Sequence, residues 1–197
     1  MSLLLGGVES GDAKKLGELI RQDPGFTVNM LVRNGRTLLH HACIGRSDSR
    51  SPMIPLLLAH PEIDVNVKNR NGSTPFMSAC SRGHTSCVRL MLLDSRVMVN
   101  EADNSGRTPL WAAHYSRHDV IGWWIASGRE MDLRGEPGNS KTGATLEWER
   151  RGERRQVATL LERFKKDAAK TRSEVRKGLG ITGQSTCCSS INFSILD

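Results

Sequence analysis

The sequence is poor in aromatic residues, which make up 5% of its 197 residues. We therefore expect a core of Leu, Ile, Val, Ala and Met in place of an aromatic-rich β-sandwich. Long hydrophobic runs are missing as well. Uncharged stretches such as residues 53–61 are much shorter than the roughly 20 apolar residues that a membrane-spanning helix needs. With 38% hydrophobic and 25% charged residues, the composition is typical of a folded protein without a transmembrane segment.

The sequence also shows no pattern of a secretion signal or of a disulfide framework. Three leucines follow Ser2, but no basic residue precedes them, and the acidic residues Glu9 and Asp12 come soon after. A signal peptide needs a longer apolar segment. The five cysteines are odd in number and irregular in spacing, which does not fit a disulfide framework. We expect an intracellular location, with the cytoplasm favoured over the nucleus.

The sequence does contain a segment that recurs three times. Residues 35–43, 72–80 and 106–114 each begin with Gly-x-Thr and carry Ala at the eighth position. Their threonines, Thr37, Thr74 and Thr108, are 37 and 34 residues apart. Later in the period, Val-Asn recurs as Val65-Asn66 and Val99-Asn100, again 34 residues apart. The chain is therefore built from repeated units.

Each recurring residue has a physical use in a helix pair. Glycine suits a turn that needs a positive φ. Threonine caps the N-terminus of a helix, and proline fits the first turn, where no backbone donor is required. Ala42, Ala79 and Ala113 are small enough for neighbouring helices to approach closely, and Cys43 and Cys80 can pack as compact apolar residues.

In phase and period, these residues resemble the ankyrin family, whose unit of about 33 residues carries Thr-Pro-Leu-His-x-Ala. Gly83-His84 stands where ankyrin units carry Gly-His between their two helices. The resemblance implies an all-α ankyrin-repeat solenoid of about five helix-turn-helix units with β-turn or hairpin tips. Residues 123–133 and 160–165 additionally resemble segments of large ankyrin-only families found in fungi.

The expected units follow from this phase. Unit one is a degenerate N-terminal capping repeat, unit two contains a short insertion, units three and four are regular, and unit five is a degenerate C-terminal capping repeat. A basic helical extension and a flexible tail follow. The bounds are 1–30, 31–67, 68–101, 102–135 and 136–166 for the five units, 167–183 for the extension and 184–197 for the tail.

The resemblance also implies where a partner binds. Ankyrin proteins use the concave face of the stack, where the turn tips and the exposed face of the first helix of each unit lie. Arg and Tyr are frequent anchors in interfaces, so Arg70, Arg82, Arg107 and Tyr115 are the leading candidates. The full predicted set is Arg33, Asn34, Arg36, Asn69, Arg70, Asn71, Ser73, Ser81, Arg82, Asp103, Asn104, Ser105, Arg107, Tyr115 and Ser116. The arginines favour an acidic protein as the partner.

Reaction chemistry finds little support in the sequence. Residues 135–142 superficially resemble a phosphate-binding loop, but Ser140 stands where that motif needs glycine before the lysine. His114 and His118 could share one helix face, yet His118 falls at the Gly-His position between helices. The pair Cys187-Cys188 could be lipidated, although an exposed tail is the simpler interpretation. We expect no catalytic residue, metal, cofactor or small-molecule substrate.

A second hypothesis concerns the basic segment 150–177. Between residues 147 and 177 there are eleven Lys or Arg and six acids, which could attract nucleic acid or an anionic membrane. The acids are interleaved with the basic residues, and that pattern is more typical of a solvated helix face. The leading hypothesis is therefore a non-enzymatic protein-interaction module.

Overall fold

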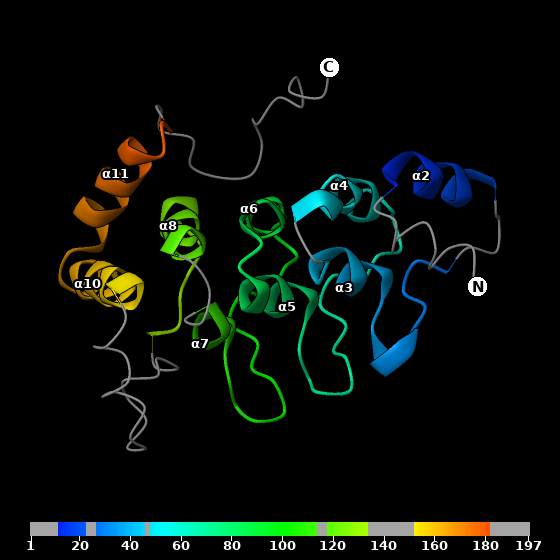
Figure 1. Cartoon of the computed structure of the whole chain (residues 1–197), viewed down its shortest axis with the longest axis horizontal. Coiled ribbons are helices and arrows are strands. Elements are labelled where there is room, and N and C mark those ends of the chain that lie inside the picture. The colour runs from blue at the N-terminus through cyan, green and yellow to red at the C-terminus, as the bar shows by residue number, and fades with distance from the viewer. Residues whose placement is uncertain (1–11, 23–26, 46–47, 114–117, 134–151, 182–197) are drawn as a thin grey trace.

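The computed structural model describes residues 12–22, 27–45, 48–113, 118–133 and 152–181. Helices in these segments form two rows (Figure 1). The inner row contains α3 (Leu38–Cys43), α5 (Pro75–Arg82) and α7 (Pro109–Ala113). The outer row contains α2 (Ala13–Gln22), α4 (Met53–Leu58), α6 (Thr85–Leu93) and α8 (His118–Ser127). Along the chain, the short 3₁₀ helix η1 (Arg33–Gly35) comes between α2 and α3, and η2 (Asp48–Arg50) comes between α3 and α4.

Within the described segments there is no strand, only an isolated bridge between Val32 and Arg36. Neighbouring helices of the same row pack on each other, as α3 does on α5 and α5 on α7. The outer helices α4, α6 and α8 pack in the same order. The expected all-α stack of helix pairs is confirmed.

Each inner helix begins at one of the recurring threonines. The hydroxyl oxygen of Thr37 accepts a hydrogen bond from the backbone N–H of His40 at 3.4 Å. Thr74 and Thr108 accept in the same way from Met77 and Trp111, both at 3.2 Å. These bonds satisfy donors that the first turn of a helix leaves unpaired. The capping role predicted for the threonines is thus present in all three units.

His40 links its own unit to the next one. Its Nδ1 accepts from the backbone N–H of Thr37 at 3.2 Å, which leaves Nε2 to donate to the carbonyl of Ser73 at 2.9 Å. The side chain is fully buried, and this burial, with smaller contributions from Arg36 and His41, lowers its pKa to about 4. The structure therefore requires the neutral imidazole at this unit boundary.

The core runs continuously through the stack. Ala79, Ala113 and Cys80 are fully buried between inner helices, as the sequence predicts for small residues. Trp124 and Phe76 are the largest fully buried side chains of the described segments, and they join the two rows. Phe76 on α5 meets Trp124 on α8 edge to face, with ring centroids 5.2 Å apart. The core thus relies on aliphatic and small residues, with few aromatic rings.

A row of asparagines joins consecutive units beside the outer helices. Asn66 donates from Nδ2 to the carbonyl of Arg96 at 2.8 Å and accepts from the backbone N–H of Met98 at 2.8 Å. Asn29 makes the equivalent pair of bonds to Glu62 and Asp64. Asn100 repeats it one unit later, so the Asn of each Val-Asn pair holds the loop of the following unit.

Arginines form a second row of contacts between units. The Arg96 guanidinium donates to the carbonyl of Leu58 at 2.7 Å. Arg129 donates to the carbonyl of Asp94 at 2.9 Å, and Arg172 to that of Ile125 at 3.2 Å. Each acceptor lies at or just past the C-terminal end of an outer helix, where carbonyls lack partners within the helix and cations are favoured. These cations therefore cap neighbouring helices.

The last two helices, α10 (Gly152–Lys166) and α11 (Ala168–Gly178), both pack against α8. On α11, Thr171 is buried. Val175 lies against Gly122 of α8, because a Cβ added to Gly122 would be 3.9 Å from the Cγ1 of Val175. The sequence treats residues 167–183 as an extension beyond the repeats, whereas the structure gives α11 a packed position next to the outer row (Figure 1). The unit boundaries remain a prediction, and residues 184–197 lie outside the described segments.

We predict that His40 makes the protein less stable in acid. Because its pKa is lowered on folding, its contribution is fully present above pH 6.5 and is lost as the pH falls toward 4. Between pH 7.5 and 5 the free energy of unfolding should fall by about 2 kcal/mol from this group. Urea unfolding at both pH values measures the change.

The matched variant is His40→Met, because unit three carries Met77 at this position. It keeps the other five histidines and should show a smaller loss of stability between the two pH values. An unchanged pH dependence in this variant would contradict the assignment to His40.

The asparagine row generates a second prediction. Asn66→Ala removes two hydrogen bonds between units and should lower the free energy of unfolding by about 1–2 kcal/mol. Asn71→Ala is the control, because Asn71 is exposed at a turn and should change stability by less than about 0.5 kcal/mol. Equal effects of the two substitutions in denaturant titrations would disprove a special role for Asn66.

Candidate partner-binding surface

The predicted partner contacts lie mainly at three turns that project from the inner row (Figure 1). Each turn contains a glycine with positive φ: Gly35 at 67°, Gly72 at 76° and Gly106 at 75°. These angles explain the recurring glycine, since other residues rarely adopt them. Equivalent positions in the three turns are defined by their distance from this glycine. The residues two before it are Arg33, Arg70 and Asn104, and the residues directly after it are Arg36, Ser73 and Arg107.

Neighbouring turns are joined by backbone hydrogen bonds. The N–H of Arg70 donates to the carbonyl of Asn34 at 3.2 Å, and the N–H of Asn104 donates to that of Asn71 at 3.0 Å. Asn104 also donates from its side chain to the carbonyl of Arg70 at 3.1 Å. The three turns therefore form one continuous ledge, whose side chains have a fixed backbone beneath them.

Several predicted site residues have a structural use within this ledge. The Oδ1 of Asn69 accepts from the backbone N–H groups of Asn71 and Ser73, at 2.9 and 3.2 Å. The carbonyl of Ser73 accepts the bond from His40. These side-chain and backbone groups shape the turn of unit three.

Asp103 performs the same task in unit four and also binds Arg107. Its fully buried carboxylate accepts from the backbone N–H groups of Ser105 and Arg107, at 2.9 and 3.0 Å. The Arg107 side chain donates from Nε at 2.8 Å and forms an ion pair at 2.7 Å. Burial alone would raise the pKa of the Asp103 carboxyl, but the hydrogen bonds from Arg107 and Ser105 outweigh it and hold this pKa below its ordinary value.

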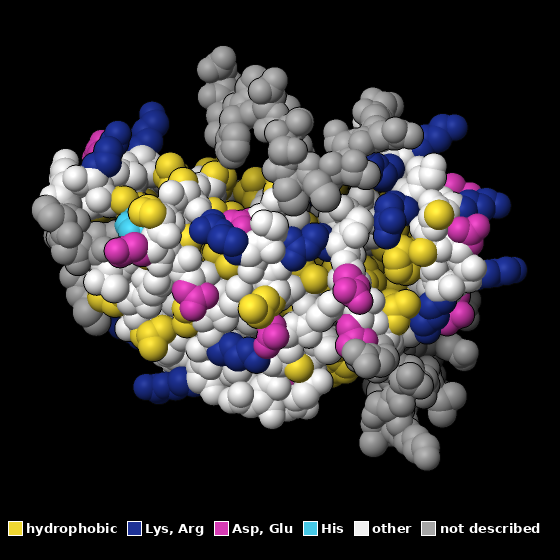
Figure 2. Space-filling view, turned by 180° about the vertical axis from the view of Figure 1, so that it is seen from behind, with side chains coloured by type: hydrophobic (Ala, Val, Ile, Leu, Met, Phe, Trp, Pro, Cys, Tyr) yellow, Lys and Arg dark blue, Asp and Glu magenta, His cyan; other side chains and the backbone are white. Residues whose placement is uncertain are grey.

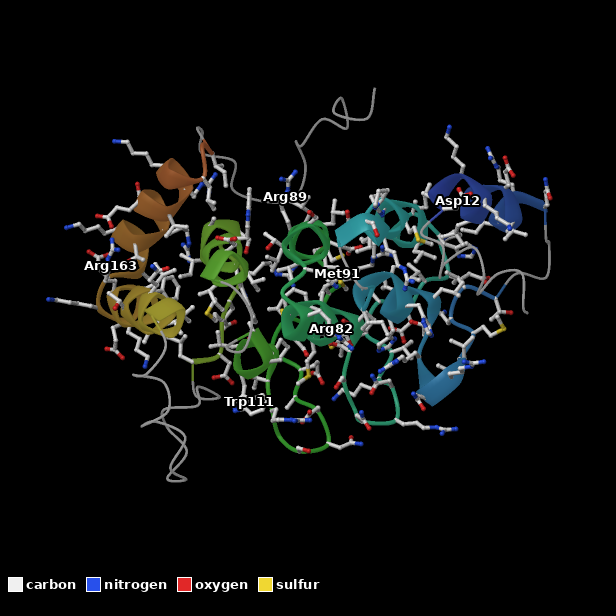
Figure 3. All side chains as sticks on the ribbon, viewed as in Figure 1. Asp12, Arg82, Arg89, Met91, Trp111 and Arg163 are labelled. Atoms are coloured by element: carbon white, nitrogen blue, oxygen red, sulfur yellow. The ribbon has the colours of Figure 1, made fainter. Side chains whose placement is uncertain are left out.

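Trp111 completes this arrangement and is absent from the predicted site. The Arg107 guanidinium lies over its ring, 5.0 Å from the centroid. Figure 3 shows Trp111 on α7 and Arg82 on the neighbouring α5, with Arg89 on α6 in the outer row. The sequence could have identified Trp111 as a site residue, because this tryptophan follows Thr108-Pro109-Leu110 at the position where the ankyrin segment carries histidine.

Other predicted contacts are exposed. Arg33, Arg70 and Arg82 are exposed and Arg36 is half-buried, and none of the four forms an ion pair within the described part of the chain. Asn34, Asn71, Ser81, Asn104 and Ser105 are exposed as well. Leu31, just before the turn of unit two, has 55% of its surface exposed and is not among the contacts predicted from the sequence. Tyr115 and Ser116 lie outside the described residues.

The basic segment 150–177 contains ion pairs in its described part. Arg163 pairs with Glu174, which joins α10 to α11, and Lys165 pairs with Glu162 at 3.5 Å. Arg172 is engaged with the end of α8. Figure 2 shows Lys and Arg interspersed with Asp and Glu on the face that it draws. The interleaving of charges expected from the sequence therefore produces contacts within the protein.

The described cysteines, Cys43, Cys80 and Cys87, are buried and form no disulfide bond within the described segments. Burial raises the thiol pKa of both Cys43 and Cys80, which makes their reactive thiolate forms scarce. In the described segments, no three His, Cys, Asp or Glu residues are grouped in a way that could hold a metal ion. Residues 135–142, His114 and the pair Cys187-Cys188 lie outside these segments.

No helix in the described segments has both the length and the apolar character needed to cross a membrane.

Comparison with known proteins supports the architecture. Residues 47–134 match the family model for ankyrin repeats in three copies. SMC5-SMC6 complex localization factor protein 1 of Bos taurus is 40% identical over 88 residues, which are 45% of this chain and 8% of that protein. Rabankyrin-5 of Mus musculus is 34% identical over 89 residues, 45% of this chain and 7% of that protein. The match therefore spans less than a tenth of either relative.

A smaller relative and a solved structure agree with this result. A putative ankyrin repeat protein of Rickettsia bellii is 33% identical over 99 residues, which are 50% of this chain and 53% of that protein. The crystal structure of EF0377, an ankyrin repeat protein, superposes with a TM-score of 0.54 at 23% identity, covering 66% of this chain and 63% of that one. The latter likeness concerns the fold alone.

Ankyrin repeats are generally protein-interaction modules, and their fold is typically non-enzymatic. The recurring threonines, the small residues between inner helices and the matched family model agree with one another. Residues 47–134 of this chain match ankyrin repeats, and its described helices stack in an all-α solenoid with the ankyrin fold.

Proposed function

We propose that this chain is a non-enzymatic interaction module that binds an acidic protein through the ledge of turn tips and the exposed ends of its inner helices. The observation that carries the proposal is a hydrogen-bonded ledge bearing arginines without an ion pair in the described part of the chain. A fixed backbone reduces the entropy that binding would otherwise cost. An intracellular setting, with the cytoplasm favoured, is part of the same proposal, and the buried thiols of the described segments, which form no disulfide bond there, support it.

Charge would act mainly through recognition and the rate of association. Exposed cations attract an acidic surface over a distance of about 8–10 Å at physiological salt. Each exposed ion pair adds only about 0.2–1 kcal/mol to affinity. Several arginines along one edge would therefore select an acidic partner, while contacts with the exposed polar side chains of the tips would fix its position.

The alternative of nucleic-acid or anionic-membrane binding through residues 150–177 has weaker support. The net positive charge of that segment favours it. However, Arg163, Lys165 and Arg172 make contacts within the protein. Binding of DNA or anionic vesicles that falls steeply with salt would favour this alternative.

Affinity purification from the native cell tests the proposal with two charge-matched variants. The tip variant carries Arg36→Glu, Arg70→Glu and Arg82→Glu. The control carries Lys14→Glu, Lys166→Glu and Lys177→Glu, three exposed positions away from the ledge. Both variants lower the net charge equally, so a general charge effect alters both alike.

Quantitative mass spectrometry of co-purifying proteins provides the measurement. We expect the partner to be depleted about tenfold or more with the tip variant, because three contacts become repulsive, and to be retained with the control. Partners that bind all three forms equally would refute binding at this ledge. Melting temperatures of the three proteins verify that the fold is kept.

A further inference from the structure

The cations of the ledge are not equivalent once their contacts are compared. Arg107 in unit four is neutralised by Asp103, whose side chain is fully buried. Lys68 in unit three pairs with Glu101 at 2.8 Å. A partner carboxylate would have to compete with these acids for either cation. Net positive charge available for binding therefore lies elsewhere on the ledge.

Units two and three carry that charge. Arg33 and Arg70 are equivalent residues of consecutive turns, and the same position in unit four holds Asn104. Arg36 lies on the other side of Gly35 from Arg33. The described part of the chain supplies no ion-pair partner to any of these three arginines.

Local packing holds Arg70 against the turn of unit two. A Cβ added to Gly35 would lie 3.2 Å from both the Cγ and the backbone nitrogen of Arg70. The Arg70 backbone also donates to Asn34 in that turn. The stem of Arg70 therefore lies against the segment that carries Arg33 and Arg36, and the three positive charges belong to one region.

An exposed apolar side chain accompanies this region. Leu31 has 55% of its surface exposed and precedes the inward-facing Val32, which is 9% exposed. In unit three the equivalent residue is Lys68, and in unit four it is Ala102. A large apolar side chain next to three cations is thus peculiar to the turn of unit two.

We infer that the partner docks on the turns of units two and three, as an extended protein segment with acidic side chains and one large apolar side chain. The acidic side chains pair with Arg33, Arg36 and Arg70, and the apolar one packs on Leu31. Arg107 stabilises the turn of unit four and takes no part in acid recognition. This inference rests on the proposed function, because it divides the proposed binding edge into a recognition half and a structural half.

Two synthetic peptides and the full chain test the inference. Both peptides are fluorescein-labelled hexaglutamates with one central insertion, Leu in the first and Ser in the second. Fluorescence anisotropy at low salt measures their binding to the wild-type chain. We expect both to bind, the Leu peptide about threefold or more tightly, since burying an apolar side chain favours association.

Three variants assign the contacts. Arg36→Gln with Arg70→Gln should weaken both peptides about tenfold, because each exposed pair contributes a factor of about 1.5–5. Leu31→Ser should remove the difference between the peptides. Asp103→Asn with Arg107→Ser gives unit four the residues that unit three carries as Asn69 and Ser73, and should leave both affinities within about twofold.

The outcomes separate the two proposals. If neither peptide binds the wild-type chain, the proposed preference for acidic partners fails, and the inference fails with it. If the peptides bind but the unit-four double variant weakens them as much as Arg36→Gln with Arg70→Gln, only the division of the edge is overturned. Equal binding of both peptides to wild type would overturn the role of Leu31. Thermal unfolding of each variant confirms that it is folded.

Discussion

Close approach between neighbouring inner helices is the constraint on which the rest of the structure depends. A repeat unit cannot bury its apolar helix faces alone and must do so against the adjacent units. Ala42, Ala79 and Ala113, all nearly or fully inaccessible, permit this approach. Once the helices are in place, the turns come near enough for the backbone of one to bond to the next. Packing of small residues therefore leads directly to the continuous ledge.

Polar contacts between units fix the position of each unit relative to the next. Asparagines hold the following loop, arginines cap the preceding outer helix, and His40 reaches the next turn. All use backbone groups as partners, so they depend on the relative position of two units and little on the identity of neighbouring side chains. Units with divergent sequences can therefore stack in one array, and units three and four carry Met77 and Trp111 where unit two has His40.

The sequence was sufficient to predict the features that depend on local chemistry. Helix starts at Thr37, Thr74 and Thr108 follow from capping, and the buried alanines follow from their period. It was insufficient where the decisive partner is distant in the chain. Arg172 binds the carbonyl of Ile125, 47 residues away, and α11 packs on α8. Neither contact can be predicted from the residues of the 167–183 extension alone. For the candidate site, the sequence predicted which residues occupy the turn tips. It did not predict that Arg107 forms an ion pair with Asp103 while the tip arginines of units two and three form none in the described part of the chain.

The buried thiols have a consequence for how the motions of this stack can be observed. Cys43 lies on α3 in unit two, and Cys80 and Cys87 lie on α5 and α6 in unit three. All three are fully buried, so none is accessible to a reagent while its unit is packed. Modification of these positions would require local opening, so its rate reports the free energy of separating particular units. The chain thus carries intrinsic probes at which fraying from the ends can be distinguished from cooperative unfolding of the whole array.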